Sequence, residues 1–275
     1  MTSLADNGST DATAAVVRSL SGELPVRWVE ASGPASASHA RNVGASAAEG
    51  RILAFCDADD ETSPGWVDAH RRAVEQSGGA ISGGLLNHTR HNDADVLFAY
   101  GIDPSTDPPF DPPADEPVVR ESTSGFAGYL PTVAGGNFAM LRQDYFAVGG
   151  MDPSYPGGAE ETDFAWRAQE AGHRVVMCGR AMVAYDLQTT MRGPLRQQRI
   201  QQRARILLWI RHRGRGMNGP SLKASLPAVA HLVLTAPVRL RTRAQRLRWA
   251  YLLRAHIGAL EGMVQYRLFP RRTTL

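Results

Sequence analysis

The sequence predicts an α/β fold, in which a mixed, mostly parallel sheet is flanked by helices and followed by a basic helical C-terminal region. Residues 1–191 alternate apolar runs of strand length with stretches of helical periodicity, the pattern typical of this class. Residues 1–191 carry 12 Arg, no Lys and 26 acidic residues, a net charge of −14, whereas residues 192–275 carry +17. We therefore expect a body, residues 1–191, and a basic tail, residues 192–275.

The first expected elements are two helices with a strand between them. Ser9 or Thr10 can cap a helix that runs to about Leu20, because hydroxyl oxygens accept the free N–H groups of a first helical turn. Val26–Val29 is a short strand, and Ala40–Ala48 is a helix of small residues.

The next strand, Ile52–Cys56, is apolar throughout, as expected for a strand buried on both faces. A helix then starts at Ser63-Pro64, with serine as its cap and proline at its first position, and stops at Gly78-Gly79. Residues 103–117 hold six prolines and five acids, so we expect a surface loop there.

In the second half of the chain, Val133–Met140 and Val175–Met177 are the expected strands. Between them, Glu160–Ala171 is a helix with acids in its first turn and a glycine after its end. The tail contributes two basic amphipathic helices, Gln197–Arg211 and Arg243–Met263.

Composition excludes several classes of protein. Two cysteines, Cys56 and Cys178, are too few for a disulfide scaffold, and no Cys/His cluster has zinc-site spacing. Both cysteines lie in or next to apolar runs, which predicts buried thiols in a reducing cytoplasm. The longest uncharged apolar stretch, Ala224–Val238, would form a helix of about 22 Å, short of the ~30 Å hydrocarbon core of a bilayer. We expect no transmembrane span.

The sharpest chemical feature is Asp57-Ala58-Asp59, directly after an apolar strand. Ligands sit at the carboxyl ends of strands in α/β sheets. Two carboxylates at such an end can share Mg²⁺ with substrate phosphate oxygens. The alternative is a solvated acidic turn before the next helix.

Three further segments carry candidate chemistry. Glu160-Glu161-Thr162-Asp163 starts a helix, where acids favour the helix dipole and where one carboxylate facing a cleft can act as a general base. Gly135-Gly136-Asn137 lets a ligand approach the backbone or marks a bend in a strand. Arg41, at a helix start, can meet a phosphate or form a surface salt bridge.

Together these segments resemble the family 2 glycosyltransferases, which have the GT-A nucleotide-sugar fold. The resemblance covers about residues 4–191, and six blocks in the family's order are more specific than any single block. The blocks are Asp6-Asn7-Gly8-Ser9-Thr10-Asp11, Ala40-Arg41-Asn42-Val43-Gly44, Asp57-Ala58-Asp59-Asp60, Gly135-Gly136-Asn137, Val148-Gly149-Gly150-Met151-Asp152 and Glu160-Glu161-Thr162-Asp163.

The resemblance implies an inverting transfer of a sugar from a nucleotide-diphosphate donor to a carbohydrate or lipid-linked acceptor, in cell-surface polysaccharide or glycoconjugate synthesis. It implies that Asp57 and Asp59 hold Mg²⁺ or Mn²⁺ and that Glu161 takes the acceptor proton. The donor-binding residues it implies are Asp6, Arg41, Asp57, Gly136 and Asn137. The alternative function is a non-catalytic nucleotide-sugar-binding protein or a truncated remnant.

The sequence departs from the family in three places. Glu161 stands where the family has an aspartate base, and Asp186 is the candidate further metal ligand near the place of a family histidine. The family's first strand and helix precede the Asp6 block, whereas here only Thr2–Ala5, a weak strand candidate, stands before it. We therefore expect the chain to lack the first strand–helix unit.

The tail has two alternative roles. Its charge and apolar faces fit an anionic membrane surface at the inner face of the plasma membrane, and they equally fit packing on the acidic body. Trp249, Leu253, Ile257 and Leu260 share one face of the second tail helix. Aromatic residues are not interleaved with the arginines for base stacking, which disfavours nucleic acid.

Overall fold

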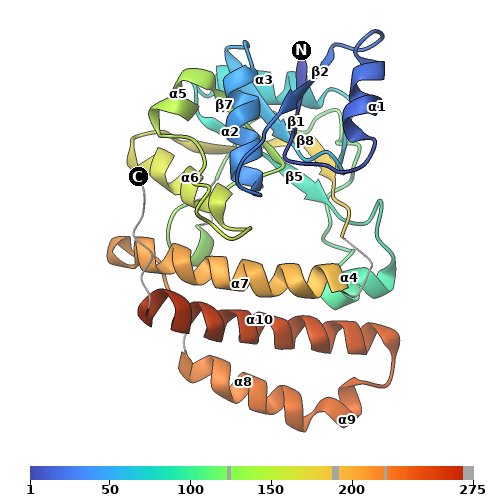
Figure 1. The fold of residues 1–275 in the computed structure, drawn as a ribbon, viewed down its shortest axis with the longest axis vertical. Coiled ribbons are helices and arrows are strands. Elements are labelled where there is room, and N and C mark those ends of the chain that lie inside the picture. Colours follow the sequence, from blue (N-terminus) through green and yellow to red (C-terminus); the bar gives the residue numbers. More distant parts are fainter. Residues whose placement is uncertain (123–124, 188–191, 220–221, 269–275) are drawn as a thin grey trace.

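The computed structural model describes residues 1–122, 125–187, 192–219 and 222–268. Its strands are β1 (Thr2–Asp6), β2 (Val26–Glu30), β3 (Ile52–Cys56), β4 (Glu61–Thr62), β5 (Ile81–Asn87), β6 (Arg120–Glu121), β7 (Asn137–Leu141) and β8 (Val175–Ala184). Its α-helices are α1 (Thr13–Leu20), α2 (Ala37–Ala47), α3 (Trp66–Gln76), α4 (Ala94–Tyr100), α5 (Arg142–Ala147), α6 (Glu160–Glu170), α7 (Arg192–His212), α8 (Leu222–Leu234), α9 (Ala236–Arg239) and α10 (Arg243–Leu268). Figure 1 shows an α/β body with the tail helices layered beneath it.

The strands form two sheets. Strands β1 and β2 pair in parallel, and the larger sheet has the order β3-β7-β5-β8-β4, with β6 also paired to β8. In the larger sheet only β5 and β8 run parallel, and the other described pairs are antiparallel. The sheet is therefore mixed, as expected, but it is not mostly parallel, because an apolar run does not specify the direction of its neighbour. No backbone pairing joins β1 to β3 within the described residues.

Three elements begin later than the sequence predicts. Helix α1 starts at Thr13, and neither Ser9 nor Thr10 caps it, because its N-cap position is Ala12. Helix α3 starts at Trp66 rather than at Ser63, because the Ser63 hydroxyl accepts the backbone N–H of Met182 at 3.2 Å instead of capping the helix. The strand expected from Val133 starts at Asn137, because Ala134 and Asn137 close a turn through an isolated bridge.

Strand β3 is the edge strand of the larger sheet, and this corrects the expectation that it is buried on both faces. Leu53 is buried, and the Phe55 ring stacks on Phe138 at 4.5 Å between centroids. The alternate side chains, Ala54 and Cys56, are exposed. Cys56 is therefore not the buried thiol that its apolar neighbours predict, because it lies on the opposite face of β3 from Leu53 and Phe55, which pack against a buried cluster.

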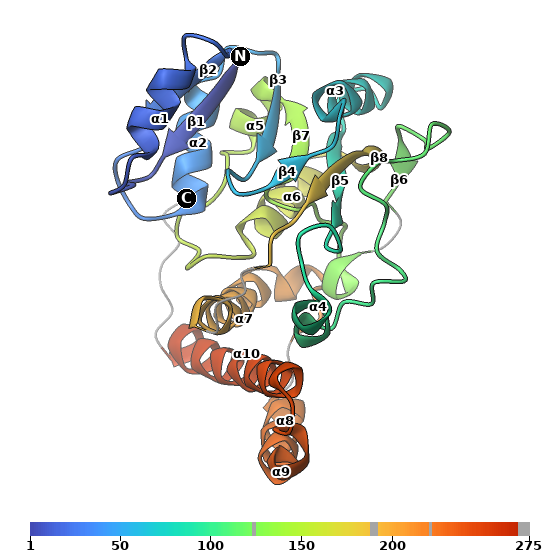
Figure 2. The same cartoon turned by 90° about the vertical axis from the view of Figure 1, so that its right-hand side faces the viewer.

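The tail packs on the body through α7, which is one of the two predicted alternatives. Apolar residues of α7 share one buried cluster with residues of the body and of α10; the cluster includes Tyr155, Trp166, Ala204, Ile206, Leu208, Met217, Ala259 and Met263. Figure 2 shows α10 lying between α7 and α8, and the Trp249 indole donates to the Leu232 carbonyl of α8 at 2.8 Å. None of the described helices combines the length and apolar character needed to cross a membrane.

Candidate active site

The predicted metal-binding carboxylates meet at one cavity. Asp57 and Asp59 follow β3, and Asp186 follows β8, so the ends of two strands bring all three to the walls of a cavity of about 390 Å³. Its opposite wall comes from the tail helices α7 and α10. The cavity therefore lies at the boundary between the body and the tail.

Asp60 belongs to the same acidic cluster, although no role was expected for it beyond its place in the Asp57-Ala58-Asp59-Asp60 block. Its Oδ2 atom is buried and has no hydrogen-bond partner among the described residues. Burial, together with the charges of Asp57 and Asp59, raises the pKa of Asp60 to about 7. A Cβ atom at Gly136 would lie 2.7 Å from Asp57 Oδ2 and 3.2 Å from Asp60 Oδ2. Only glycine leaves room for these two carboxylates.

The donor set at this cavity fits a hard divalent cation. Within the described part of the chain, no group of three or more His, Cys, Asp or Glu side chains is already placed to hold a metal ion. Mg²⁺ usually takes only one or two protein carboxylates and completes its shell with water and substrate phosphate. Asp57 and Asp59 supply such carboxylates, and the orphaned oxygen of Asp60 lies beside them.

Arg41 lies within the site rather than at the surface. Its Nη2 atom contacts Asp57 Oδ1 at 2.5 Å, and its Nη1 atom is 3.9 Å from Glu160 Oε1. The side chain is mostly buried, with 14% exposed. Arg41 therefore links the end of β3 to the start of α6, and its guanidinium is already engaged with carboxylates of the protein.

Of the three acids that open α6, Glu161 has the freest carboxylate. Glu160 accepts a hydrogen bond from the Gly158 N–H and faces Arg41. Asp163 accepts hydrogen bonds from the side chains of Tyr155 and Arg167. No hydrogen bond or ion pair joins the Glu161 carboxylate to another described side chain. Burial and the neighbouring Glu160 charge raise the pKa of Glu161 to about 7, the range that suits a general base at neutral pH.

Comparison with protein families decides the assignment. A family model described as glycosyl transferase family 2 matches residues 3–147, which is more than half of the chain. The chain belongs to glycosyltransferase family 2. A second model, described as the N-terminal domain of galactosyltransferase, matches residues 116–187. No curated protein matched the chain.

The solved structure of one mannosyltransferase supports the GT-A fold of this glycosyltransferase. The chain is similar to the mannosyltransferase PcManGT from Pyrobaculum calidifontis in complex with GDP-Man and Mn²⁺, with 18% sequence identity and a TM-score of 0.56 over 93% of this chain and 76% of that one. It is also similar to residues 1–349 of S. aureus TarS in complex with UDP-GlcNAc, with 12% identity and a TM-score of 0.49 over 98% and 84% of the two chains. At such identities the likeness concerns the fold alone.

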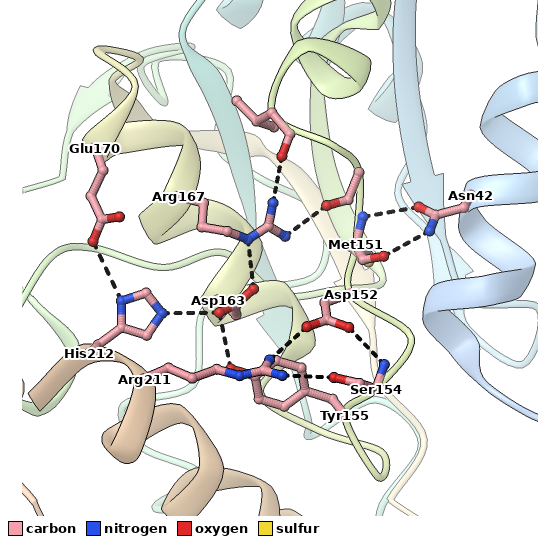
Figure 3. A network of polar contacts seen from close by, with 12 residues as sticks. Asn42, Met151, Asp152, Ser154, Tyr155, Asp163, Arg167, Glu170, Arg211 and His212 are labelled. Carbon is pink, nitrogen blue, oxygen red and sulfur yellow. Dashed lines mark hydrogen bonds and ion pairs between the residues drawn. The ribbon is translucent and has the colours of Figure 1, made fainter. Parts of the chain in front are cut away.

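A buried polar network behind the site was not foreseen from the sequence (Figure 3). Asp163 accepts hydrogen bonds from Tyr155 at 3.0 Å and Arg167 at 2.8 Å, and its Oδ1 atom is 3.0 Å from His212 Nε2. Burial alone would raise the pKa of Asp163, but the bonds from His212 and Arg167 outweigh it and lower the pKa. Because Asp163 is committed to this network, which joins α6 to the end of α7, it is not a candidate base.

Among the predicted donor-binding residues, Asp57 lines the cavity, whereas Arg41 and Gly136 contact Asp57 without being lining residues. The predicted base Glu161 is not a lining residue either.

The two remaining donor-binding side chains lie elsewhere. Asn137 is fully buried, and its amide bonds with the Trp66 indole, the His70 ring and two backbone carbonyls. It therefore does not line the sugar site, because strand β7 turns this side chain into the core; Trp66 lies in the core with it. Asp6 is buried at the end of β1, where it accepts from the Ser9 N–H at 2.8 Å and the Trp28 indole at 3.0 Å, and it is not among the residues that line the cavity.

Proposed function

We propose that this glycosyltransferase moves a sugar from a nucleotide-diphosphate donor to an acceptor hydroxyl with inversion at the anomeric carbon, in the synthesis of a cell-surface polysaccharide or glycoconjugate. One observation carries the proposal. Glu161 keeps an unpaired carboxylate with a raised pKa, and Arg41 connects its neighbour Glu160 to the strand-end residue Asp57. The base is therefore the neighbour of a residue whose ion pair with Arg41 reaches the strand end that is expected to bind the diphosphate.

In the proposed step, the Glu161 carboxylate takes the proton of the acceptor hydroxyl. The acceptor oxygen forms a bond to the anomeric carbon from the face opposite the leaving group, while the bond from that carbon to the diphosphate oxygen breaks. The electron pair leaves with the nucleoside diphosphate, so one displacement inverts the configuration. Glu161→Gln removes the base, which is typically worth 10²–10⁴-fold in rate.

Asp57, Asp59 and Asp186 would hold Mg²⁺ or Mn²⁺ in this proposal. When bound, the cation supplies charge neutralisation for the departing diphosphate. Arg41, which pairs with Asp57, and Gly136, whose missing side chain leaves room for Asp57, would hold that carboxylate in position for the cation. The complex of the similar mannosyltransferase PcManGT with GDP-Man and Mn²⁺ is consistent with this assignment.

The test is release of nucleoside diphosphate from a panel of nucleotide sugars, with Mn²⁺ or with EDTA. We expect Glu161→Gln to lose at least a hundredfold of turnover while retaining nucleotide binding, and Asp59→Ala to lose the metal-dependent part of donor binding. Glu23→Gln, an exposed acid outside the site, is the matched control. Metal-independent nucleotide binding without any turnover in the wild type would favour the non-catalytic alternative.

For its location, we propose a cytoplasmic protein that contacts the inner face of the plasma membrane through α8 and α9. Their exposed apolar side chains include Leu226 at 61%, Leu234 at 80% and Val238 at 59% exposure. The exposed Arg239 and Arg241 lie beside them, and such surfaces bind anionic bilayers.

Cosedimentation with phosphatidylglycerol vesicles tests this location. Leu234→Ser should weaken binding, and higher salt should weaken it further, whereas Val67→Ser, at an equally exposed position of the body, should not. Equal vesicle binding by Leu234→Ser and the wild type would contradict the proposal.

A further inference from the structure

His88 lines the cavity but has no role in the site described so far. It directly follows β5, which runs parallel to β8 with Asn87 paired to Ala184. His88 therefore leaves its strand level with Tyr185, the residue before Asp186. The rings of His88 and Tyr185 meet edge to face, with 6.1 Å between their centroids. His88 thus belongs to the strand-end edge that carries the candidate metal ligands.

The His88 ring is held by a buried carboxylate of the proline-rich loop, residues 103–117. The side chain of Asp107 is only 3% exposed, and its Oδ1 atom lies 2.9 Å from His88 Nδ1. Its Oδ2 atom accepts the backbone N–H groups of His88 and Thr89, both at 2.8 Å. Burial alone would raise the pKa of Asp107, but the bonds from His88 and Thr89 outweigh it and lower the pKa. An ionised carboxylate only accepts hydrogen bonds, so Nδ1 is the nitrogen that carries a proton.

The proline-rich loop is itself fixed on the sheet. Phe110, in the middle of the loop, is 8% exposed and packs with Met182 and Ala184 of β8. The guanidinium of Arg90 lies over the other side of this ring, 4.1 Å from its centroid. The six prolines of the loop restrict its backbone further. Asp107 therefore has a defined place from which to orient the imidazole.

The other ring nitrogen of His88 is available to a ligand. Nε2 lies on the side of the ring away from Asp107, and no hydrogen bond or ion pair joins it to another described residue. A neutral ring offers a lone pair there, whereas a ring with both protons offers an N–H and a positive charge. No Arg or Lys is among the described residues that line the cavity, so His88 is the lining residue that can carry a positive charge.

The charges around the ring select the class of ligand. Asp57, Asp59 and Asp186 line the same cavity, and Asp107 lies behind the ring, so an anion alone would be repelled. A diphosphate that arrives with a divalent cation differs, because the cation meets the carboxylates. The diphosphate oxygens that the cation leaves free still need donors, and their charge favours the ring that carries both protons. Hydrogen bonds between such charged groups are among the strong ones in proteins.

We propose that His88, oriented by Asp107, donates a hydrogen bond from Nε2 to the diphosphate of the nucleotide; the inference rests on the nucleotide-diphosphate donor of the proposed function. The same bond meets the negative charge that grows on the diphosphate as it departs. Asp107 acts only through His88, so it is a positioning residue. The proline-rich loop thereby supports the donor site from outside the cavity.

Nucleotide binding tests this role without relying on turnover. In calorimetric titrations of the full chain with MgUDP and MgGDP, His88→Asn should raise the Kd about tenfold or more, the usual effect of losing a hydrogen bond between charged groups. His88→Arg keeps a positive charge and should bind more tightly than His88→Asn. His91→Asn is the matched control, because His91 contacts Glu61 at 2.9 Å and does not line the cavity. Equal Kd values for His88→Asn and His91→Asn would overturn the proposal.

Imidazole ¹⁵N NMR of the wild type observes the bond itself. The His88 Nε2 signal should shift on saturation with MgUDP or MgGDP, while the Nδ1 signal should change little. Asp107→Asn should weaken nucleotide binding, because an amide donates as well as accepts and no longer fixes the proton on Nδ1. Asp115→Asn, an exposed acid of the same loop, should not. Unchanged ring signals would overturn the proposal, as would a ¹⁴N coupling to bound Mn²⁺ that His88→Asn abolishes, since Nε2 would then be a metal ligand.

Turnover separates this inference from the proposed function. Nucleotide binding that depends on His88, without transfer from any nucleotide sugar, would contradict the proposed function and keep His88 as a diphosphate ligand. Sugar transfer by His88→Asn with the kcat and donor KM of the wild type would overturn the role of His88 and keep the proposed function.

Discussion

Replacing His212 by alanine tests how firmly the tail is anchored to the catalytic body. His212 is 2% exposed, its Nε2 atom lies 3.0 Å from Asp163 Oδ1, and its ring lies 5.0 Å from that of Trp166. A hydrogen bond to a charged group contributes about 1.5–3 kcal/mol, and the missing ring also leaves a void. Asp163 keeps its bonds from Tyr155 and Arg167, so its charge is not left unpaired. We therefore expect His212→Ala to lower the free energy of unfolding by about 3 kcal/mol, from the lost hydrogen bond and the void together.

Thermal unfolding provides the assay. For a chain of this size, 1 kcal/mol corresponds to a shift of about 2–4 °C in Tm, so Tm should fall by about 6–12 °C. His231→Ala, an exposed histidine of α8, should stay within about 0.5 kcal/mol of the wild type. A double-mutant cycle with Asp163→Asn should give a coupling energy of about 1 kcal/mol or more. Equal Tm values for His212→Ala and His231→Ala would refute the conclusion that α7 is fixed to α6 through Asp163.

Three further predictions concern the site and the core beneath it. Glu161 must be ionised to act as a base, and its pKa is raised to about 7, so kcat/KM should rise with pH up to about 7 and then level off. Glu160→Gln removes the neighbouring charge and should move the rising part of the profile to lower pH. A flat profile from pH 5 to 8 would exclude Glu161 as the base. Gly136→Ala places a Cβ atom 2.7 Å from Asp57 Oδ2, so it should lower kcat/KM at least tenfold with a small change in Tm, and unchanged kinetics would contradict this. Asn137→Ala leaves buried partners unsatisfied and should cost about 3 kcal/mol of stability, measured by urea unfolding, without changing the KM of the acceptor in the protein that remains folded.

Sequence could predict the parts of the site that depend on which residues directly follow an expected strand. Asp57 and Asp59 directly follow the expected strand Ile52–Cys56, so their place at a strand end was foreseeable. Asp186 joins them because β8 runs on to Ala184 in the same direction as β3, which brings the carboxyl ends of both strands to one edge of the sheet. Sequence could not place Asn137 in the core, because strand alternation leaves open which face is inward until the pairing is known.

Long-range contacts explain the remaining differences. Asp163 and His212 are 49 residues apart in the sequence, and the residues around neither of them predict that the two side chains meet. Strand β3 has one exposed face because only the face with Leu53 and Phe55 packs against a buried cluster, and an apolar run alone does not show which face another layer covers.

The division of the sheet has a consequence for how the protein opens. Strands β1 and β2 share no backbone ladder with the larger sheet among the described residues, and α2 connects them to it. The side-chain oxygen of Asn42, in α2, accepts a hydrogen bond from the Met151 N–H at 3.0 Å, and its amide nitrogen donates one to the Met151 carbonyl at 2.8 Å. The same oxygen also accepts a hydrogen bond from the Tyr145 hydroxyl. A few side-chain bonds of this kind release at lower free energy than a continuous sheet does. In native-state hydrogen exchange, we therefore expect β1 and β2 to exchange together as an early-opening unit, while β5 and β8 stay protected until the whole body unfolds.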